Sequence, residues 1–276
     1  MVWKICLVIS AAAIVVTDKL FPVFGQSYSF WLIPLLFIGI FVALYVIQLA
    51  VFVLMILFTD IKKPPKGEKL FRFLLKNLLP IVIRLARVEI NADGLTQLPD
   101  NKNMLFVCNH QHDFDPIIMF SAFPDSKISF IGKEDILEEM KFIAKAMHLI
   151  SCLFIDREND RKAAKTVISA IKYLKSGERS IGLFPEGYCS KDGELQPLRN
   201  GSLKIALKSE VPIAICAVNN TKQIPKNMFR RKTVIEFRLI EVIEADFYQN
   251  MTTAELGDYI HGKMAEALKE FKEFKG

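Results

Sequence analysis

Two long apolar segments open the chain. Residues 2–16 are apolar apart from Lys4 and Ser10, and in residues 31–58 the one polar interruption is Gln48. The second segment is long enough to cross a bilayer with some tilt, whereas the first is of marginal length. Together they predict an N-terminal helical hairpin, residues 1–60, that anchors the protein with one or two transmembrane helices.

Basic residues follow this anchor closely. Lys62, Lys63 and Lys66 lie in a proline-containing linker over residues 62–67. By the positive-inside rule these charges place that flank, and everything after it, in the cytoplasm. We therefore expect a cell-membrane protein whose larger domain lies on the cytoplasmic side, against the phospholipid surface.

Residues 68–88 mix apolar and basic side chains at helical spacing, with Lys69, Arg72 and Lys76 among the apolar positions. Pro80 is expected to divide this stretch into two short helices. The pattern over residues 61–88 is typical of amphipathic helices that lie on anionic headgroups. It is equally typical of helices that pack on the protein's own domain, and both can hold.

Beyond residue 88, short apolar runs alternate with helical patterns. Strands are expected at 88–90, 104–108, 127–131, 152–155, 180–184, 211–218 and 233–243, and helices at 116–123, 134–149, 161–175 and 203–207. Asp160 is the expected cap of the helix over 161–175, and Thr252 with Glu255 forms a capping box for the last helix. The alternation predicts an α/β fold for residues 89–276, with a mixed, largely parallel sheet flanked by helices.

Composition narrows the class of protein. The net charge of +6 and a pI near 9.0 favour contact with an anionic surface or substrate. No basic stripe with interleaved aromatic residues is visible, so we expect no nucleic-acid partner. The cysteines are few, odd in number and widely spaced, which argues against a disulfide framework and fits free thiols in a reducing compartment.

Residues 104–116 combine a strand end with ionisable side chains. Asp115 precedes Pro116, which favours an extended Asp115 at the start of a helix. We expect one oxygen of this N-cap to accept a backbone N–H and the other to hold an imidazole N–H of His110. That pair would leave the second ring nitrogen free to act as a base. The alternative is that Asp115 only caps the helix and His110 is a surface histidine.

Other predicted strands also end in charged or polar groups. Besides Asn109-His110, the strand ends carry Lys133, Asp156-Arg157 and Glu186-Gly187. Ligands bind beyond the carboxyl ends of parallel strands, so these groups are expected to share one cleft. A cleft of this kind suits binding of an anion and transfer of a proton.

Four sequence blocks resemble those of the glycerolipid acyltransferases, the 1-acylglycerol-3-phosphate O-acyltransferase family. Asn109-His110 and Asp115 are similar to its NHx4D motif, and residues 154–157 (FIDR) to its second block. Residues 184–187 (FPEG) and 211–213 (VPI) are similar to the third and fourth. Order and spacing agree over residues 88–218.

The resemblance implies a reaction and a set of roles. A fatty acyl chain would pass from acyl-CoA or acyl-acyl carrier protein to the free hydroxyl of lysophosphatidate, giving phosphatidate, with no cofactor and no metal. His110 would be the general base and Asp115 would orient it, while Arg157 would bind the acceptor's phosphate. The residues that we assign to substrate binding are Asn109, Lys133, Arg157, Phe184, Pro185, Glu186 and Gly187.

One departure from the family pattern concerns the acceptor. The third block of the family continues with Thr and Arg, where this chain has Tyr188 and Cys189. This change removes a phosphate-binding arginine. The candidates to replace its charge are Lys133, Lys191, Arg199 and Lys204, and a lysophospholipid with a different head group is an alternative acceptor.

Two readings from other classes compete. His110, His112, Asp113 and Asp115 crowd together as in two-metal hydrolases, although His148 and His261, the remaining histidines, lack motif context. The second reading is a non-catalytic, membrane lipid-binding protein that keeps only the fold. A histidine–aspartate pair argues against it, because binding alone does not need a base.

Overall fold

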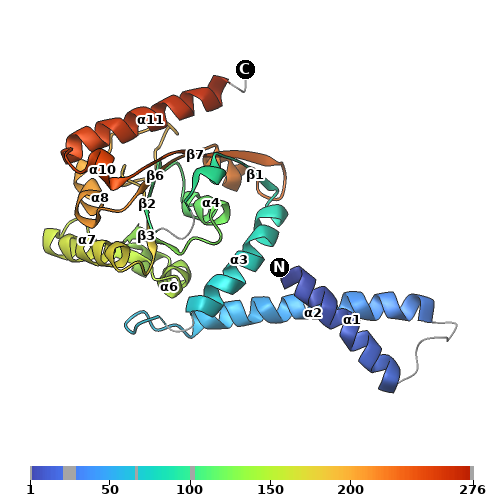
Figure 1. Ribbon diagram of the computed structural model, residues 1–276. Helices are drawn as coiled ribbons and strands as arrows, with labels where there is room; N and C mark the ends of the chain where they lie inside the picture. Colours follow the sequence, from blue (N-terminus) through green and yellow to red (C-terminus); the bar gives the residue numbers. More distant parts are fainter. Residues whose placement is uncertain (1, 21–28, 66–67, 100–102, 274–276) are drawn as a thin grey trace.

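A central seven-stranded sheet with helices on both faces forms the larger part of the molecule (Figure 1). The computed structural model describes residues 2–20, 29–65, 68–99 and 103–273. The strands are β1 (Val88–Asp93), β2 (Leu105–Cys108), β3 (Ile128–Lys133), β4 (Leu153–Ile155), β5 (Ser180–Leu183), β6 (Ile213–Asn219) and β7 (Thr233–Ile243). The predicted mixed, largely parallel sheet is confirmed.

The strand order places the ends of five strands at one edge. The order is β1-β7-β6-β2-β5-β3-β4, and every neighbouring pair is parallel except β6 and β7. β2 is central, with Val107 opposite Leu183 of β5 and Cys108 opposite Cys216 of β6. The carboxyl ends of β2 to β6 therefore lie at the same edge, as the ligand cleft of a parallel sheet requires.

Alternating side chains of β2 divide the interior into two layers. Phe106 and Cys108 point into a core shared with α3 and α4, whereas Leu105 and Val107 point into a core shared with α7 and α11. The period of two along a strand explains this division. The helices beyond the N-terminal pair are α3 (Glu68–Leu85), α4 (Asp115–Ala122), α5 (Ile136–Glu139), α6 (Lys141–Leu149), α7 (Asp160–Lys175), α8 (Lys204–Ser209), α9 (Ile224–Asn227), α10 (Ala245–Tyr248) and α11 (Thr253–Glu273).

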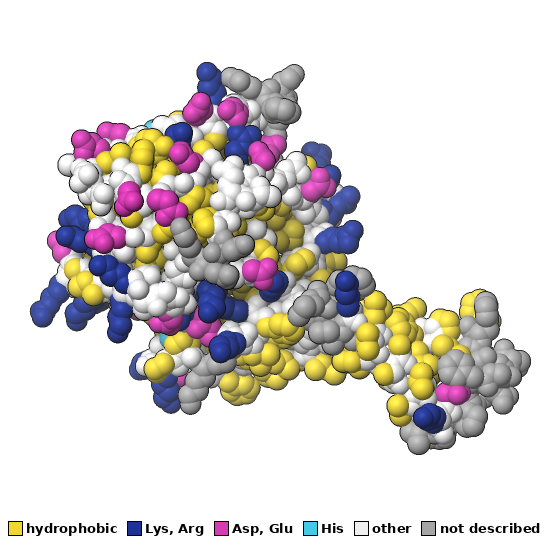
Figure 2. Space-filling view, in the orientation of Figure 1, with side chains coloured by type: hydrophobic (Ala, Val, Ile, Leu, Met, Phe, Trp, Pro, Cys, Tyr) yellow, Lys and Arg dark blue, Asp and Glu magenta, His cyan; other side chains and the backbone are white. Residues whose placement is uncertain are grey.

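The N-terminal helices α1 (Val2–Leu20) and α2 (Ser29–Leu57) cross each other and project from the sheet domain (Figure 1). Gln48 of α2 donates a hydrogen bond to the Cys6 sulfur of α1 at 3.7 Å. Within the described residues one segment, Trp31–Leu57, is long and apolar enough to span a membrane. Its apolar side chains line the arm in Figure 2. The connection expected between the helices lies mostly outside the described residues.

Helix α3 corrects the prediction of two short helices. It runs unbroken from Glu68 to Leu85, with Pro80 inside. A proline cannot donate the usual hydrogen bond to the carbonyl four residues back. Apolar contacts hold the helix in place, because Phe71, Leu74, Leu78 and Leu79 before Pro80 are buried, and Ile83 after it packs against the same core. The helix thus packs on its own domain, as one of the two sequence readings expected.

Arg72 belongs to the interior rather than to a lipid-facing surface. Its guanidinium donates to the carbonyl oxygens of Ile128 (2.8 Å) and Ile150 (2.6 Å) and pairs with Glu68 at 2.8 Å. Arg179 also pairs with Glu68, at 2.7 Å. The network joins α3 to β3 and to the turn before β4, so a charge that the sequence pattern assigned to the amphipathic surface instead fixes the helix to the sheet.

The helix ends agree with the predicted caps in one case and differ from the prediction in others. Thr252 and Glu255 form the expected reciprocal capping box, with N–H···O distances of 2.7 and 3.2 Å. The cap of α7 is Asn159 rather than Asp160, since the Asn159 side chain accepts the Lys162 N–H at 3.1 Å. The single helix expected over residues 134–149 is two helices, α5 and α6, with an irregular Met140 between them.

We predict that Arg72→Ala destabilises the sheet domain. It would leave buried carbonyls and the Glu68 carboxylate without a partner, at a cost of about 3 kcal/mol. For a chain of this size the midpoint of thermal unfolding would fall by roughly 5–10 °C in detergent. The control is Lys69→Ala, an exposed charge on the same helix. Equal midpoints for both variants would contradict the role of the network.

Candidate active site

A single carboxylate oxygen organises the loop between β2 and α4. Asp115 is buried, and its Oδ2 accepts the His110 Nδ1–H at 2.8 Å, the Gln111 N–H at 2.6 Å and the His112 N–H at 2.8 Å. The expected contact between His110 and Asp115 is therefore present. Because the carboxylate only accepts, the proton of the imidazole lies on Nδ1 and the lone pair on Nε2.

The expected capping geometry is wrong in two respects. α4 begins at Asp115 itself, and the residue before the helix is Phe114, in helical backbone conformation. The two oxygens of Asp115 do not share the donors as expected, since Oδ2 takes all three and Oδ1 has no hydrogen-bond partner among the described residues. The donors come from the loop before the helix, which folds back over the carboxylate.

Glu186 braces this loop from the neighbouring strand. Its Oε1 accepts the His110 backbone N–H at 2.5 Å and its Oε2 accepts the Gln196 N–H at 2.8 Å. Burial raises the pKa of this carboxyl, and the two N–H donors oppose that shift. The sequence assigned Glu186 to the substrate, whereas the structure engages both of its oxygens with the backbone. The side chain positions His110.

The Asn109 side chain, which the sequence assigned to substrate binding, forms hydrogen bonds within the protein. Its side chain donates to the Val218 carbonyl at 2.9 Å and accepts the Val218 N–H at 2.8 Å. It is 1% exposed. The amide therefore joins the end of β2 to β6 in the manner of a ladder pair and fixes the point at which His110 leaves the sheet.

The third block shapes the wall beside His110. The Phe184 ring stacks on the imidazole, with 4.4 Å between ring centroids. The Pro185 carbonyl accepts the Arg199 N–H at 2.8 Å. Gly187 has a φ of +83°, and a Cβ there would lie 2.8 Å from Nε of Arg199. Glycine is thus required twice, for its backbone conformation and for the close approach of Arg199.

Three basic side chains near the site, Lys133, Arg157 and Arg199, differ in whether they form an ion pair. Lys133 is ion-paired with Asp135, which raises the pKa of the lysine. Partial burial and the neighbouring Arg199 lower the pKa of Arg157. Neither Arg157 nor Arg199 forms an ion pair with any residue that the structure describes. Two neighbouring guanidinium groups that repel each other and have no ion-pair partner among the described residues can bind an anion.

Cys189 contacts His110, which the sequence analysis did not anticipate. Its sulfur lies 3.2 Å from Nε2 of His110 and 3.5 Å from an oxygen of Asp113. Burial and the nearby carboxylates raise the pKa of the thiol to about 12. The other four cysteines are buried. The one feature of the sequence that could have indicated this contact is the position of Cys189 just after the third block, where the family has an arginine.

The crowded histidines and carboxylates do not assemble as a two-metal site. The His112 ring stacks on the Phe114 ring, with 5.2 Å between the ring centroids. His148 contacts the carbonyl of Lys63 in the linker, and His261 lies on α11. In the described part of the chain, the group of potential ligands at this position contains a single histidine, His110.

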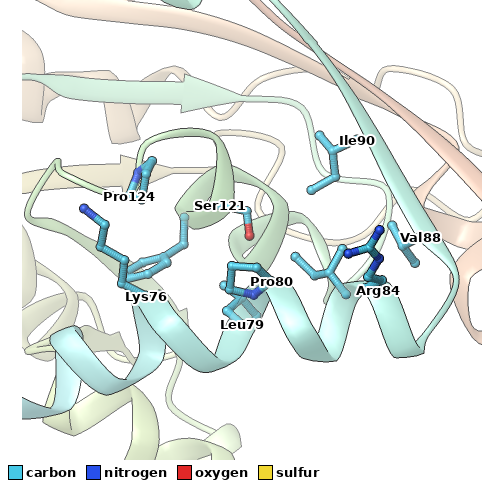
Figure 3. Close-up of a pocket in the computed structure, with 10 residues that line it drawn as sticks. Lys76, Leu79, Pro80, Arg84, Val88, Ile90, Ser121 and Pro124 are labelled. Atoms are coloured by element: carbon cyan, nitrogen blue, oxygen red, sulfur yellow. The ribbon is translucent and has the colours of Figure 1, made fainter. Parts of the chain in front are cut away.

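An apolar pocket of about 450 Å³ lies between α3, β1 and the end of α4 (Figure 3). Leu79, Ile83 and Ile90 contribute to its apolar lining, whereas Lys76 and Arg84 add positive charge to it. It is separated from Asp115 by the length of α4, because Ser121 at the far end of that helix lines it. The pocket is therefore distinct from the surroundings of His110.

Comparisons with known proteins agree with the four blocks. Residues 89–219 match the model of a family described as Acyltransferase. A 1-acyl-sn-glycerol-3-phosphate acyltransferase of Borreliella burgdorferi is 28% identical over 187 residues, covering 65% of this chain and 74% of the relative. A protein of the same description from Escherichia coli is 25% identical over 207 residues, covering 75% of this chain and 82% of the relative.

A solved structure shares the fold. The crystal structure of the 1-acyl-sn-glycerophosphate acyltransferase PlsC from Thermotoga maritima superposes with a TM-score of 0.63 at 21% identity. The superposition covers 84% of this chain and 91% of the Thermotoga maritima chain. The region that matches the Acyltransferase family, residues 89–219, carries the motif residues that gather at one edge of the sheet.

Proposed function

We propose that the protein transfers a fatty acyl chain from a thioester, acyl-CoA or acyl-acyl carrier protein, to the free hydroxyl of lysophosphatidate, giving phosphatidate for phospholipid synthesis. The observation that carries this proposal is the 2.8 Å contact between His110 Nδ1 and Asp115 Oδ2, which leaves Nε2 as a proton acceptor at the open edge of the sheet. Relatives described as acyltransferases for 1-acyl-sn-glycerol-3-phosphate support the choice of acceptor.

The chemistry requires one base and a good leaving group. His110 Nε2 takes the proton from the acceptor hydroxyl as that oxygen attacks the thioester carbonyl. Asp115 stabilises the imidazolium that forms. When the tetrahedral intermediate collapses, the thiolate leaves and takes the proton from His110. No protein nucleophile, metal or cofactor is needed in this sequence of steps.

Arg157 and Arg199 are proposed to hold the phosphate of the acceptor. Both guanidinium groups lack a carboxylate partner among the described residues, and each offers a planar fork that matches a phosphate group. Arg199 lies against Gly187 of the third block, two residues before Cys189. We infer that Arg199 supplies the positive charge that the family places at the position of Cys189, which favours lysophosphatidate over an acceptor without a phosphate monoester.

A membrane location on the cytoplasmic side is proposed from two features. The span Trp31–Leu57 is followed by Lys62 and Lys63, which the positive-inside rule keeps in the cytoplasm. The outer face of α3 exposes Leu70, Phe73 and Leu85, with exposed fractions of 49%, 41% and 65%. An apolar helix face next to a span is suited to the lipid interface, where both substrates carry their acyl chains.

The experiment for the reaction is acyl transfer from a labelled thioester to lysophosphatidate. We predict that His110→Ala lowers kcat by about 10²- to 10⁴-fold, because general-base assistance of this size is lost. The matched control is His112→Ala, which removes the neighbouring imidazole, stacked on Phe114. Equal rates for wild type and His110→Ala would refute catalysis by His110 and favour a lipid-binding protein.

A second prediction concerns the acceptor alone. Arg157→Ala and Arg199→Ala should each raise the KM for lysophosphatidate by about 10- to 100-fold, because each removes charge-assisted hydrogen bonds. The KM for the thioester donor should change little. Lys191→Ala, which removes an exposed charge of the same loop, is the control. An increase confined to the donor KM, or a preference for a zwitterionic lysophospholipid, would overturn the assignment.

A further inference from the structure

Three donor atoms of different chemistry meet at the open side of His110. They are Nε2 of His110, the sulfur of Cys189 and a carboxylate oxygen of Asp113, and all lie within 4.8 Å of one another. The sulfur is 3.2 Å from the nitrogen and 3.5 Å from the oxygen. Nitrogen, sulfur and carboxylate oxygen are the donor set that proteins use for Zn²⁺.

The separations suit a metal ion. Zinc binds sulfur at about 2.3 Å and nitrogen or oxygen at about 2.0–2.2 Å, so on a tetrahedron a sulfur ligand lies roughly 3.5–3.7 Å from a nitrogen or oxygen ligand, and nitrogen lies roughly 3.3–3.5 Å from oxygen. The sulfur of Cys189 is 3.5 Å from the Asp113 oxygen, which fits this geometry, and 3.2 Å from Nε2 of His110, which is shorter by about 0.3 Å. The three atoms spread over 4.8 Å, so an ion requires the exposed carboxylate of Asp113 to turn toward Nε2 of His110. The exposed Asp113 and the partly exposed Cys189 leave an open path from solvent.

The surroundings prepare the ligands for a cation. Asp115 holds the Nδ1–H of His110, so the free Nε2 lone pair is directed toward Cys189. A carboxylate behind a metal-binding histidine is the usual arrangement in zinc sites. Asp115 and Glu186 also contribute negative charge, which disfavours a free thiolate but favours one that is neutralised by a divalent ion.

We propose that His110, Asp113 and Cys189 form a binding site for Zn²⁺, and that zinc bound there reversibly inhibits acyl transfer. The inhibition rests on the proposed function, because the lone pair that coordinates zinc is the one that must accept the substrate proton. The three side chains leave a fourth position to water. The metal is thus a regulator of the base and takes no part in the reaction.

Binding can be tested without turnover. Full-length protein in detergent would be titrated with Co²⁺ and then Zn²⁺, since a cobalt–thiolate bond absorbs in the near ultraviolet. We expect this band in wild type, its displacement by one equivalent of Zn²⁺, and its loss in Cys189→Ser. Cys6→Ser removes a thiol in α1 and should keep the band. Absence of the band in wild type, or its persistence in Cys189→Ser, would overturn the site.

Inhibition is tested by the ratio of activity with and without Zn²⁺ in each protein. Wild type should lose activity and regain it with EDTA, whereas Cys189→Ser and Asp113→Asn should require at least about tenfold more Zn²⁺. Equal sensitivity of the variants and wild type would contradict the proposal. The cobalt spectrum does not depend on acyl transfer, so it still judges the site if the proposed reaction fails.

Discussion

Three N–H groups donate to one buried oxygen of Asp115, and the geometry of the site depends on that interaction. Two donors are backbone groups of Gln111 and His112, so the carboxylate fixes the path of the loop. The third is the ring of His110, so the same atom fixes the orientation and tautomer of the proposed base. A side chain without an acceptor oxygen at residue 115 would leave all three of these N–H groups without their partner.

The sheet supplies the remaining constraints from neighbouring strands. Asn109 ties the end of β2 to Val218 of β6, and Glu186 reaches from the end of β5 to the backbone of His110. Because β2 lies between β5 and β6, both braces act at the point where His110 leaves the sheet. Arg157 follows β4, and Arg199 lies against Gly187 after β5, so both proposed anchors of the acceptor's phosphate come from strand ends on the same side of β2.

The periodic pattern of apolar residues along the chain predicted most of the helices and strands. Strands with strong alternation and the last helix with its Thr252–Glu255 box could be read directly, because local pattern and tertiary burial agree there. The effect of Pro80 on its helix could not be predicted, since whether a proline ends a helix depends on packing elsewhere in the structure. Arg72 was misread for a similar reason, as a sequence does not show which long basic side chain reaches into the interior.

Within the site, the pair of His110 and Asp115 followed from spacing and from the family motif, whereas the tasks of Asn109 and Glu186 did not. Motif membership indicates that a residue matters, but contact with backbone or with substrate is decided by strands far apart in the sequence. The contact of Cys189 with His110 spans 79 positions and required the coordinates.

The tautomer of His110 decides whether its Nε2 can act as a base. Nitrogen-15 NMR of histidine-labelled protein, assigned with His110→Gln, distinguishes the protonated ring nitrogen from the unprotonated one in the neutral imidazole. We expect a proton on Nδ1, held by Asp115, and an unprotonated Nε2. A neutral ring protonated at Nε2 would leave no base at the open edge of the sheet and would contradict the central claim.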